Sequence, residues 1–135
     1  MKSCLMFIGL FFISFSSLAQ GRLSGSFVIN KGEVDAKWGD SIIYVFTLKN
    51  SGDKSIDILK VTGSCTCQTP YNSNIQTIKP GKTGTIKVKV ALNQKTLSDD
   101  VENGVINYDK SVTVLTNGKK QKYELFLRAK IKIKK

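Results

Sequence analysis

The residues best suited to chemical reaction are Cys65 and Cys67, which are separated only by Thr66. In a straight strand, side chains two positions apart point to the same face, with Cβ atoms about 6–7 Å apart, whereas a disulfide needs about 3.8 Å. An internal bond therefore requires the chain to bend at Thr66, although a β-branched residue resists unusual φ angles. The ring would be tight, and its bond relatively oxidising and easily reduced.

The chemistry of this pair has several interpretations. In an oxidising compartment, our leading prediction is the internal disulfide, either as a structural clip or as a labile redox element. The alternatives are two free thiols, a soft-metal site for an ion such as Cu(I), and an intermolecular bond. Neither methionine nor histidine lies near the pair in sequence, and thiol oxidoreductases more typically show Cys-x-x-Cys at the start of a helix. We therefore predict no cofactor and no bound metal.

The composition argues against hydrolytic chemistry. The chain contains no histidine, which removes the commonest general base and the commonest transition-metal ligand. A Ser-His-Asp or Cys-His site is therefore impossible within this chain alone. No pair of acidic residues clusters on an expected strand. The sequence accordingly predicts a protein that is not an enzyme.

The N-terminal segment has the features of a secretory signal. Lys2 supplies a positive charge, residues 5–15 form an uncharged apolar run, and Ala19 ends a short stretch with small residues suited to cleavage. The run is shorter than the roughly 20 apolar residues that span a bilayer, and a retained anchor is the alternative. We predict a signal peptide over residues 1–19, a single domain over residues 20–135, and export to the periplasm, the cell envelope or the extracellular space.

The chain is strongly basic, with 21 Lys and Arg residues against 10 Asp and Glu residues and a formal net charge of +11. Such a balance favours anionic partners, and export leaves anionic glycan or lipid rather than nucleic acid. The candidate patch consists of Lys119, Lys120, Lys122, Arg128, Lys130 and Lys132. Lys87 and Lys89 would extend it if their strand lay in the same sheet. The alternative is a solvated row of lysines that protects a sheet edge, and high charge also serves solubility.

Alternating apolar residues predict a succession of strands and no convincing helix. Residues 41–50 are apolar on both faces at their start, which predicts a central strand covered on both sides. A change of parity within residues 55–62 predicts a bulge. Polar segments are expected at residues 31–40, 71–74 and 93–104. Further strands are expected at residues 27–29, 85–92, 108–116 and 121–133, the last as a sheet edge.

Turn signals complete the pattern. Pro80-Gly81 suits the centre of a type II turn, and Asn117-Gly118 is the strongest hairpin signal in the chain. About seven strands with regularly spaced turns over about 100 residues are typical of an immunoglobulin-like fold. We therefore predict an all-β protein with an antiparallel immunoglobulin-like β-sandwich.

Several of these segments resemble one known family. The matching pieces are Phe46 to Gly52, Ile58 to Val61, Ser64 to Cys67, Ile78 to Gly81 followed by Gly84 and Ile86, and Val112 to Asn117. Over roughly residues 27–130, the chain resembles the secreted bacterial family called domain of unknown function fifteen seventy-three. That family is similar to the immunoglobulin-like domains of the abnormal-spindle and hydin type. Its members usually have glycine where this chain has Thr66.

The resemblance implies a binding or assembly module of the cell envelope, without an established activity. We predict an exported, non-enzymatic module that binds another envelope protein, and we expect Thr66 and the Pro80-Gly81 turn to lie on one end surface. One alternative is a thiol-redox or soft-metal-handling protein that acts through Cys65 and Cys67. The other is an electrostatic binder of anionic glycan or lipid, whose contacts would weaken as ionic strength rises.

Overall fold

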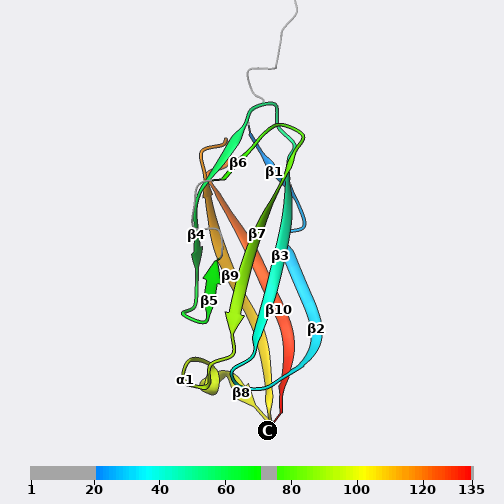
Figure 1. Cartoon of the computed structure of the whole chain (residues 1–135), viewed down its shortest axis with the longest axis vertical. Coiled ribbons are helices and arrows are strands. Elements are labelled where there is room, and N and C mark those ends of the chain that lie inside the picture. The colour runs from blue at the N-terminus through cyan, green and yellow to red at the C-terminus, as the bar shows by residue number, and fades with distance from the viewer. Residues whose placement is uncertain (1–20, 71–75, 135) are drawn as a thin grey trace, which may run out of the picture.

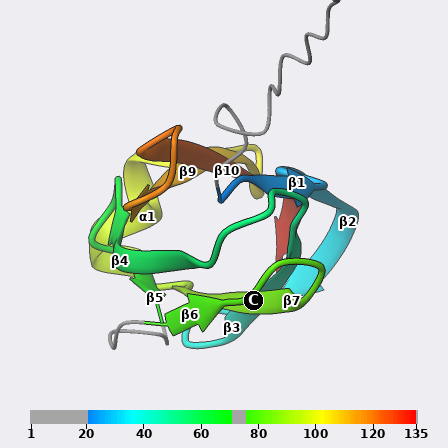
Figure 2. The ribbon, with the colours of Figure 1, turned by 90° about the horizontal axis from the view of Figure 1, so that it is seen from above.

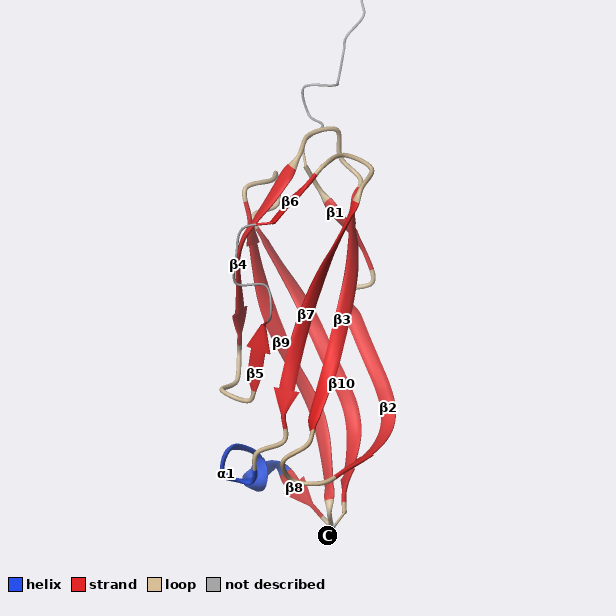
Figure 3. Cartoon of the chain, viewed as in Figure 1, coloured by secondary structure: helices blue, strands red, loops and turns tan. Residues whose placement is uncertain are grey.

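The computed structural model describes residues 21–70 and 76–134. In these residues two sheets stack face to face in an elongated sandwich, and one short α-helix lies at one end (Figures 1 and 3). The predicted signal peptide at residues 1–19 and the polar loop predicted at residues 71–74 lie outside the described residues.

The first sheet has the order β1 (Leu23–Gly25), β3 (Ser41–Asn50), β7 (Thr83–Ala91), β5 (Gln68–Pro70). The second has the order β2 (Val28–Ala36), β10 (Lys122–Ile133), β9 (Val105–Thr116), β4 (Ile56–Gly63), β6 (Gln76–Ile78), with β8 (Val101–Glu102) paired to β9.

The predicted all-β immunoglobulin-like sandwich is confirmed. The described residues form ten strands rather than about seven, because β1, β5, β6 and β8 have only two or three residues each. Strands that short carry too few residues to leave an alternating pattern. All pairings are antiparallel except that of β2 with β10, which is parallel.

The core lies between the inner faces of the two sheets, which enclose it when the molecule is seen along its long axis (Figure 2). Alternate residues of the long strands fill it, and its largest fully buried members include Tyr44, Phe46, Leu48, Ile86, Leu125, Leu127 and Ile131. The opposite face of β3 is not covered. Ile43 and Val45 are 37% and 43% exposed, so the prediction that β3 is covered on both sides is wrong.

The paired strands β2 and β10 differ most from expectation. The segment predicted as polar continues β2 as far as Ala36, with a bulge at Gly32, whose φ is 69°. The bulge appears as a register shift, since Asn30 pairs with Arg128 and Glu33 with Lys130. β10 lies between β2 and β9 and is not a sheet edge. That prediction failed because β2, its parallel partner, lacks regular alternation.

The predicted turns and the bulge in β4 are confirmed. The pairing of β4 with β9 shifts register between Ile58 and Lys60. At the β6–β7 turn, the Lys82 amide donates to the Lys79 carbonyl at 2.9 Å and Gly81 has a φ of 78°, as a type II turn requires. The β9–β10 hairpin forms at Asn117, although its connection is longer than two residues.

The segment after β7 was predicted as an irregular loop, but it contains a helical turn. Asn93 caps α1 (Gln94–Leu97) by accepting a hydrogen bond from the Lys95 amide at 2.8 Å, and a 3₁₀ turn follows at Ser98–Asp100. Leu97 is fully buried and fixes this segment to the core. Within the described part of the chain, no helix has the length and apolar character needed to cross a membrane.

A buried polar side chain joins several segments at the other end of the sandwich. Asn50 is fully buried, and its amide nitrogen donates to the carbonyls of Lys54 at 2.7 Å and Ile78 at 2.8 Å. Its side-chain oxygen accepts from the amides of Arg22 at 3.1 Å and Gly52 at 3.0 Å. All four hydrogen bonds of the side chain are therefore satisfied, as a buried amide requires.

Candidate functional site

Cys65 and Cys67 form an internal disulfide in the connection between β4 and β5. Their Cα atoms are 5.1 Å apart because the chain turns at Thr66, and the Gln68 amide closes the turn by donating to the Cys65 carbonyl at 3.1 Å. Thr66 is exposed at the tip of this turn, Cys65 is half-buried and Cys67 is 2% exposed. We call the segment from Gly63 to Gln68 the disulfide corner.

Two residues that sequence reasoning missed hold the disulfide corner against β9. The hydroxyl oxygen of Tyr108 lies 3.3 Å from the Cys67 sulfur and accepts a hydrogen bond from the Gln68 side-chain nitrogen at 3.1 Å. The side-chain oxygen of Gln68 in turn accepts from the Ser64 amide at 2.8 Å. All of these contacts except that of Ser64 are buried. The alternation of apolar residues in the sequence indicates that Tyr108 points into the core, but nothing in the sequence indicates that it meets Gln68 and Cys67 there.

Gly63 allows this arrangement because Gln68 approaches it closely. A Cβ atom on Gly63 would lie 2.8 Å from the Gln68 side-chain oxygen and 3.1 Å from its Cβ. Either contact would displace the Gln68 side chain from Tyr108. The glycine at the end of β4 is therefore explained by close approach and not by a positive φ.

Burial raises the pKa of Tyr108 to about 12, an effect that the Gln68 hydrogen bond opposes and the charge of Asp100 reinforces. Burial likewise raises the pKa of Tyr44, with a further contribution from Tyr108. Both hydroxyls therefore remain protonated, and able to donate, at any physiological pH.

The raised pKa of Tyr108 predicts alkaline destabilisation. In the unfolded chain this phenol ionises near pH 10, whereas in the folded protein it ionises near pH 12, so stability is retained below pH 10 and falls as pH rises to 12. The loss from this residue is expected to be about 2–3 kcal/mol, at 1.36 kcal/mol per pKa unit. Urea unfolding at pH 8 and pH 11.5 measures it, and Tyr108→Phe should reduce the difference. An equal pH dependence in both proteins would contradict the assignment.

The Pro80-Gly81 turn does not share a surface with the disulfide corner. The Gly81 amide donates to the Asn50 carbonyl at 2.8 Å at one end of β7, whereas Gln68 pairs with Val90 near the other end. Figure 1 shows the β6–β7 and β4–β5 connections near opposite ends of that strand. The separation between Thr83 and Val90 is about 23 Å at 3.3 Å per residue. The predicted end surface of Thr66, Pro80 and Gly81 is therefore wrong, because the extended β7 lies between them.

The predicted basic patch is divided in the structure. Lys119 and Lys120 lie in the β9–β10 connection, while Lys122, Arg128, Lys130 and Lys132 alternate along the outer face of β10. Lys87 and Lys89 lie on β7, in the other sheet, so they do not extend this face.

Acidic residues of neighbouring strands pair with part of this face. Arg128 contacts Asp109 at 3.1 Å, and Lys130 and Lys132 contact Glu33 at 3.9 and 3.5 Å. These exposed pairs contribute little to stability, but they lower the net positive charge of the face.

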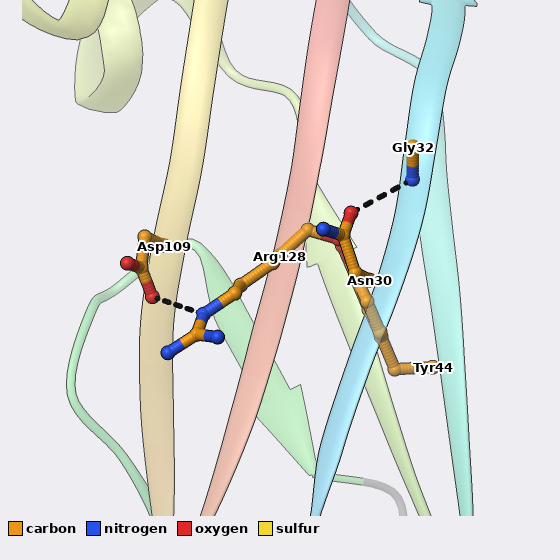
Figure 4. Close-up of polar contacts among 5 residues, drawn as sticks. All are labelled: Asn30, Gly32, Tyr44, Asp109 and Arg128. Carbon is orange, nitrogen blue, oxygen red and sulfur yellow. Dashed lines mark hydrogen bonds and ion pairs between the residues drawn. The ribbon is translucent and has the colours of Figure 1, made fainter.

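A shallow groove of about 340 Å³, lined largely by polar residues, runs over the outer face of β2, β10 and β9. The Asn30 side chain accepts from the Gly32 amide at 2.8 Å at the β2 bulge, and Arg128 extends across β10 to Asp109 (Figure 4). The Arg128 carbonyl accepts from the Tyr44 hydroxyl at 2.9 Å, which joins the groove to the opposite sheet. Its charged groups are paired with one another and solvent-exposed. Among the described residues, no three potential ligands gather into a metal site.

One side of β3 has no strand partner in the described structure between Ser41 and Thr47. β1 pairs only with Leu48–Asn50, and β2 belongs to the other sheet. The Asp40 carbonyl accepts from the Leu92 amide and the Asn50 amide donates to the Lys82 carbonyl, at the two ends of β7. The backbone groups of even-numbered β3 residues therefore point toward β7, and those of odd-numbered residues point to the open side. We call residues 41–47 the β3 edge. The exposed Ile43 and Val45 lie along it, opposite Lys89 and Lys87 of β7.

The family comparison identifies the chain. The family model described as "Protein of unknown function (DUF1573)" matches residues 26–131. The chain belongs to the DUF1573 family. This match confirms the family resemblance seen in the sequence, and it includes both the disulfide corner and the β3 edge.

Solved structures similar to this DUF1573 protein share its fold at low sequence identity. A protein of unknown function from Porphyromonas gingivalis W83 has a TM-score of 0.61 and 16% identity, over 82% of this chain and 46% of its own. The ASH/PapD-like domain 7 of human CEP192 has a TM-score of 0.59 and 7% identity, over 99% of both chains. Vibrio cholerae VesB protease has a TM-score of 0.55 and 12% identity, over 87% of this chain and 33% of its own. The chain thus spans about half of the P. gingivalis protein, and no curated protein matches it.

Proposed function

We propose that this protein is an exported, non-enzymatic module of the bacterial cell envelope that binds another protein through the β3 edge. The observation that carries the proposal is the open side of a central strand with two exposed apolar side chains beside it, Ile43 and Val45. Unpaired edge strands of this kind accept an additional strand from a partner. Export is supported by the signal-like N-terminal sequence, and an internal disulfide suits an oxidising compartment.

The β3 edge differs from the other long sheet edge of the described structure. β2 is interrupted by its bulge at Gly32 and carries Lys31, Glu33 and Asp35, which are features that protect an edge from pairing. The β3 edge lacks both a bulge and a charged residue between Ser41 and Thr47. Its seven residues extend about 23 Å, which is long enough to pair with a partner strand of ordinary length.

The chemistry of the partner follows from this edge. Backbone hydrogen bonds to the odd-numbered residues of β3 would supply affinity, and alternate side chains of the added strand would contact Ile43 and Val45. Lys87 and Lys89 flank these residues and would favour acidic side chains on the incoming segment. The expected ligand is therefore an extended protein segment with alternating apolar and acidic residues.

A photo-crosslinking residue placed at Val45 tests this proposal in the producing cell, with the same residue at Val28 as a matched control. Both are exposed strand valines, at 43% and 40%, but they lie on different sheets. We expect a crosslinked protein partner at Val45 and none at Val28. The identified partner should then bind Val45→Pro at least ten-fold more weakly, because proline removes an outward-pointing amide.

Either of two outcomes would count against the β3 edge. Partner binding that is unchanged in Val45→Pro, or equal crosslinking at both valines, would refute the β3 edge as the binding site. Binding that is lost at high salt but insensitive to Val45→Pro would indicate the charged outer face of β10 instead, since surface charge contacts are screened. Circular dichroism of Val45→Pro shows whether the sandwich remains folded.

A further inference from the structure

The disulfide presents its two sulfur atoms unequally. Cys65 is half-buried beside the exposed Thr66, whereas Cys67 is 2% exposed and faces Tyr108 in the core. Cys65 is therefore the more accessible residue of the pair to a thiol in solution, although its sulfur also accepts a hydrogen bond from the Cys67 amide at 3.1 Å. In thiol–disulfide exchange, the attacked sulfur is set by access, and the rate depends on how well the other sulfur carries negative charge.

We propose that Cys65 is a thiol-capture site, at which a thiolate from outside the protein attacks the Cys65 sulfur and displaces Cys67. The new bond joins the incoming sulfur to Cys65, and the electron pair of the Cys65–Cys67 bond leaves with the Cys67 sulfur as a thiolate. No net oxidant or reductant is consumed, because a disulfide and a thiolate are exchanged for another disulfide and thiolate. This activity goes beyond the proposed strand binding at the β3 edge and does not rest on it.

Tyr108 is positioned to stabilise the leaving sulfur. A disulfide sulfur carries no hydrogen, so in the 3.3 Å contact between Cys67 and Tyr108 the phenol must be the donor. The Gln68 side chain already donates to the Tyr108 oxygen, which leaves the phenol hydrogen for the sulfur. With a pKa near 12, Tyr108 keeps that hydrogen at any physiological pH. A hydrogen bond to a thiolate is stronger than one to a neutral sulfur, so Tyr108 favours the displaced state more than the resting state.

The same geometry makes capture reversible. The Cys67 thiolate would remain beside Cys65, since the Ala91 amide donates to the Cys67 carbonyl at 2.8 Å and anchors this residue to β7. The thiolate can attack the mixed disulfide at Cys65, restore the internal bond and release the captured thiol. The ligand class is therefore any accessible thiol, either a small molecule or a cysteine on an extended segment of another protein.

Mass mapping of the purified wild-type protein tests where capture occurs. The protein is equilibrated in a buffer of reduced and oxidised glutathione, quenched in acid and digested with pepsin, and the modified cysteine is located by fragmentation. A parallel sample uses an unstructured peptide with one cysteine in place of glutathione. We expect mixed disulfide on Cys65 to exceed that on Cys67 at least ten-fold. Equal labelling, preferential labelling of Cys67 or no mixed disulfide at any ratio would overturn the proposal.

The comparison of glutathione with the cysteine peptide shows whether a small-molecule thiol or a protein cysteine is the better ligand. Faster capture of the peptide thiol than of glutathione at equal thiolate concentration would identify a protein cysteine as the better ligand. The reverse order would identify a small thiol. Either order supports the site, provided that the modification lies on Cys65.

A second measurement tests the role of Tyr108 as a positioning residue for the leaving sulfur. The rate of reduction by glutathione is compared for wild type, Tyr108→Phe and Tyr123→Phe. Tyr123 is a matched control, because it is a buried tyrosine whose hydroxyl bonds instead to the Leu23 amide at 3.1 Å. We expect about ten-fold slower exchange in Tyr108→Phe and an unchanged rate in Tyr123→Phe, as loss of one hydrogen bond to a charged group implies.

Two results would overturn the role of Tyr108. One is a wild-type rate in Tyr108→Phe, and the other is equal slowing in both variants, which would point to a general effect of losing a buried hydroxyl. The ratio of wild-type to Tyr108→Phe rates should also stay constant below the pKa of the attacking thiol, because Tyr108 remains protonated throughout that range. A ratio that changes with pH there would contradict the assignment.

Discussion

Replacement of Asn50 by alanine is expected to lower the free energy of unfolding by about 4 kcal/mol, since each buried hydrogen bond contributes about 1 kcal/mol and its loss leaves a backbone group unpaired. The side chain makes four hydrogen bonds, of which the one to Ile78 is buried and those with Arg22, Gly52 and Lys54 are part-buried. Asn50 itself is fully buried, which limits the access of water to these partners. Urea unfolding with an unchanged m-value measures the loss.

Asn117 provides a matched control for that experiment. It is also an asparagine with two side-chain hydrogen bonds, from the Asp57 amide at 2.7 Å and to the Asp57 carboxylate at 3.1 Å, but it is exposed. Asn117→Ala is expected to cost less than about 1 kcal/mol, because solvent can take over these bonds. Similar losses in the two variants would show that burial does not set the contribution of Asn50.

Leu125→Ala is expected to lower the free energy of unfolding by about 3 kcal/mol, through lost burial and a cavity in the core. Leu125 is fully buried on β10, which lies between β2 and β9 and so is an interior strand of its sheet. If β10 were the sheet edge that its lysines indicate, its side chains would be less enclosed. Thermal and urea unfolding both report this loss.

Leu59→Ala is the corresponding control, because Leu59 is 45% exposed at the β4 bulge. Its truncation should change stability by no more than about 0.5 kcal/mol. A large loss of unfolding free energy for Leu59→Ala and a small one for Leu125→Ala would contradict the observation that Leu125 faces the core and Leu59 faces solvent.

Local pattern was sufficient to predict the fold class and most long strands. β3 and β7 have strict alternation on their inner faces, and the Pro80-Gly81 turn follows from the conformational limits of its two residues. β2 was missed beyond Ile29, because it is polar, bulged at Gly32 and held by its parallel partner. The length of β2 depends on its pairing with β10, which lies about 100 residues later in the chain, and not on the sequence of β2 itself.

The site was predictable only in part for the same reason. The need for a bend at Thr66 follows from bond geometry, and the structure has that bend. Gln68 ends the disulfide corner and begins β5, whereas Tyr108 lies on β9 in the opposite sheet, so no spacing in the sequence relates them. The β3 edge is likewise a property of topology, since it depends on the chain leaving β1 for the other sheet after Gly25.

The parallel pairing of β2 with β10 has a consequence for when the molecule can fold. β10 is the last strand of the sandwich in chain order, yet β2 pairs along it and the Leu23 amide bonds to Tyr123 over a separation of 100 residues. Contacts so distant in sequence form slowly, because the intervening chain must be ordered before they are made. The sandwich therefore cannot be completed during synthesis until β10 has emerged.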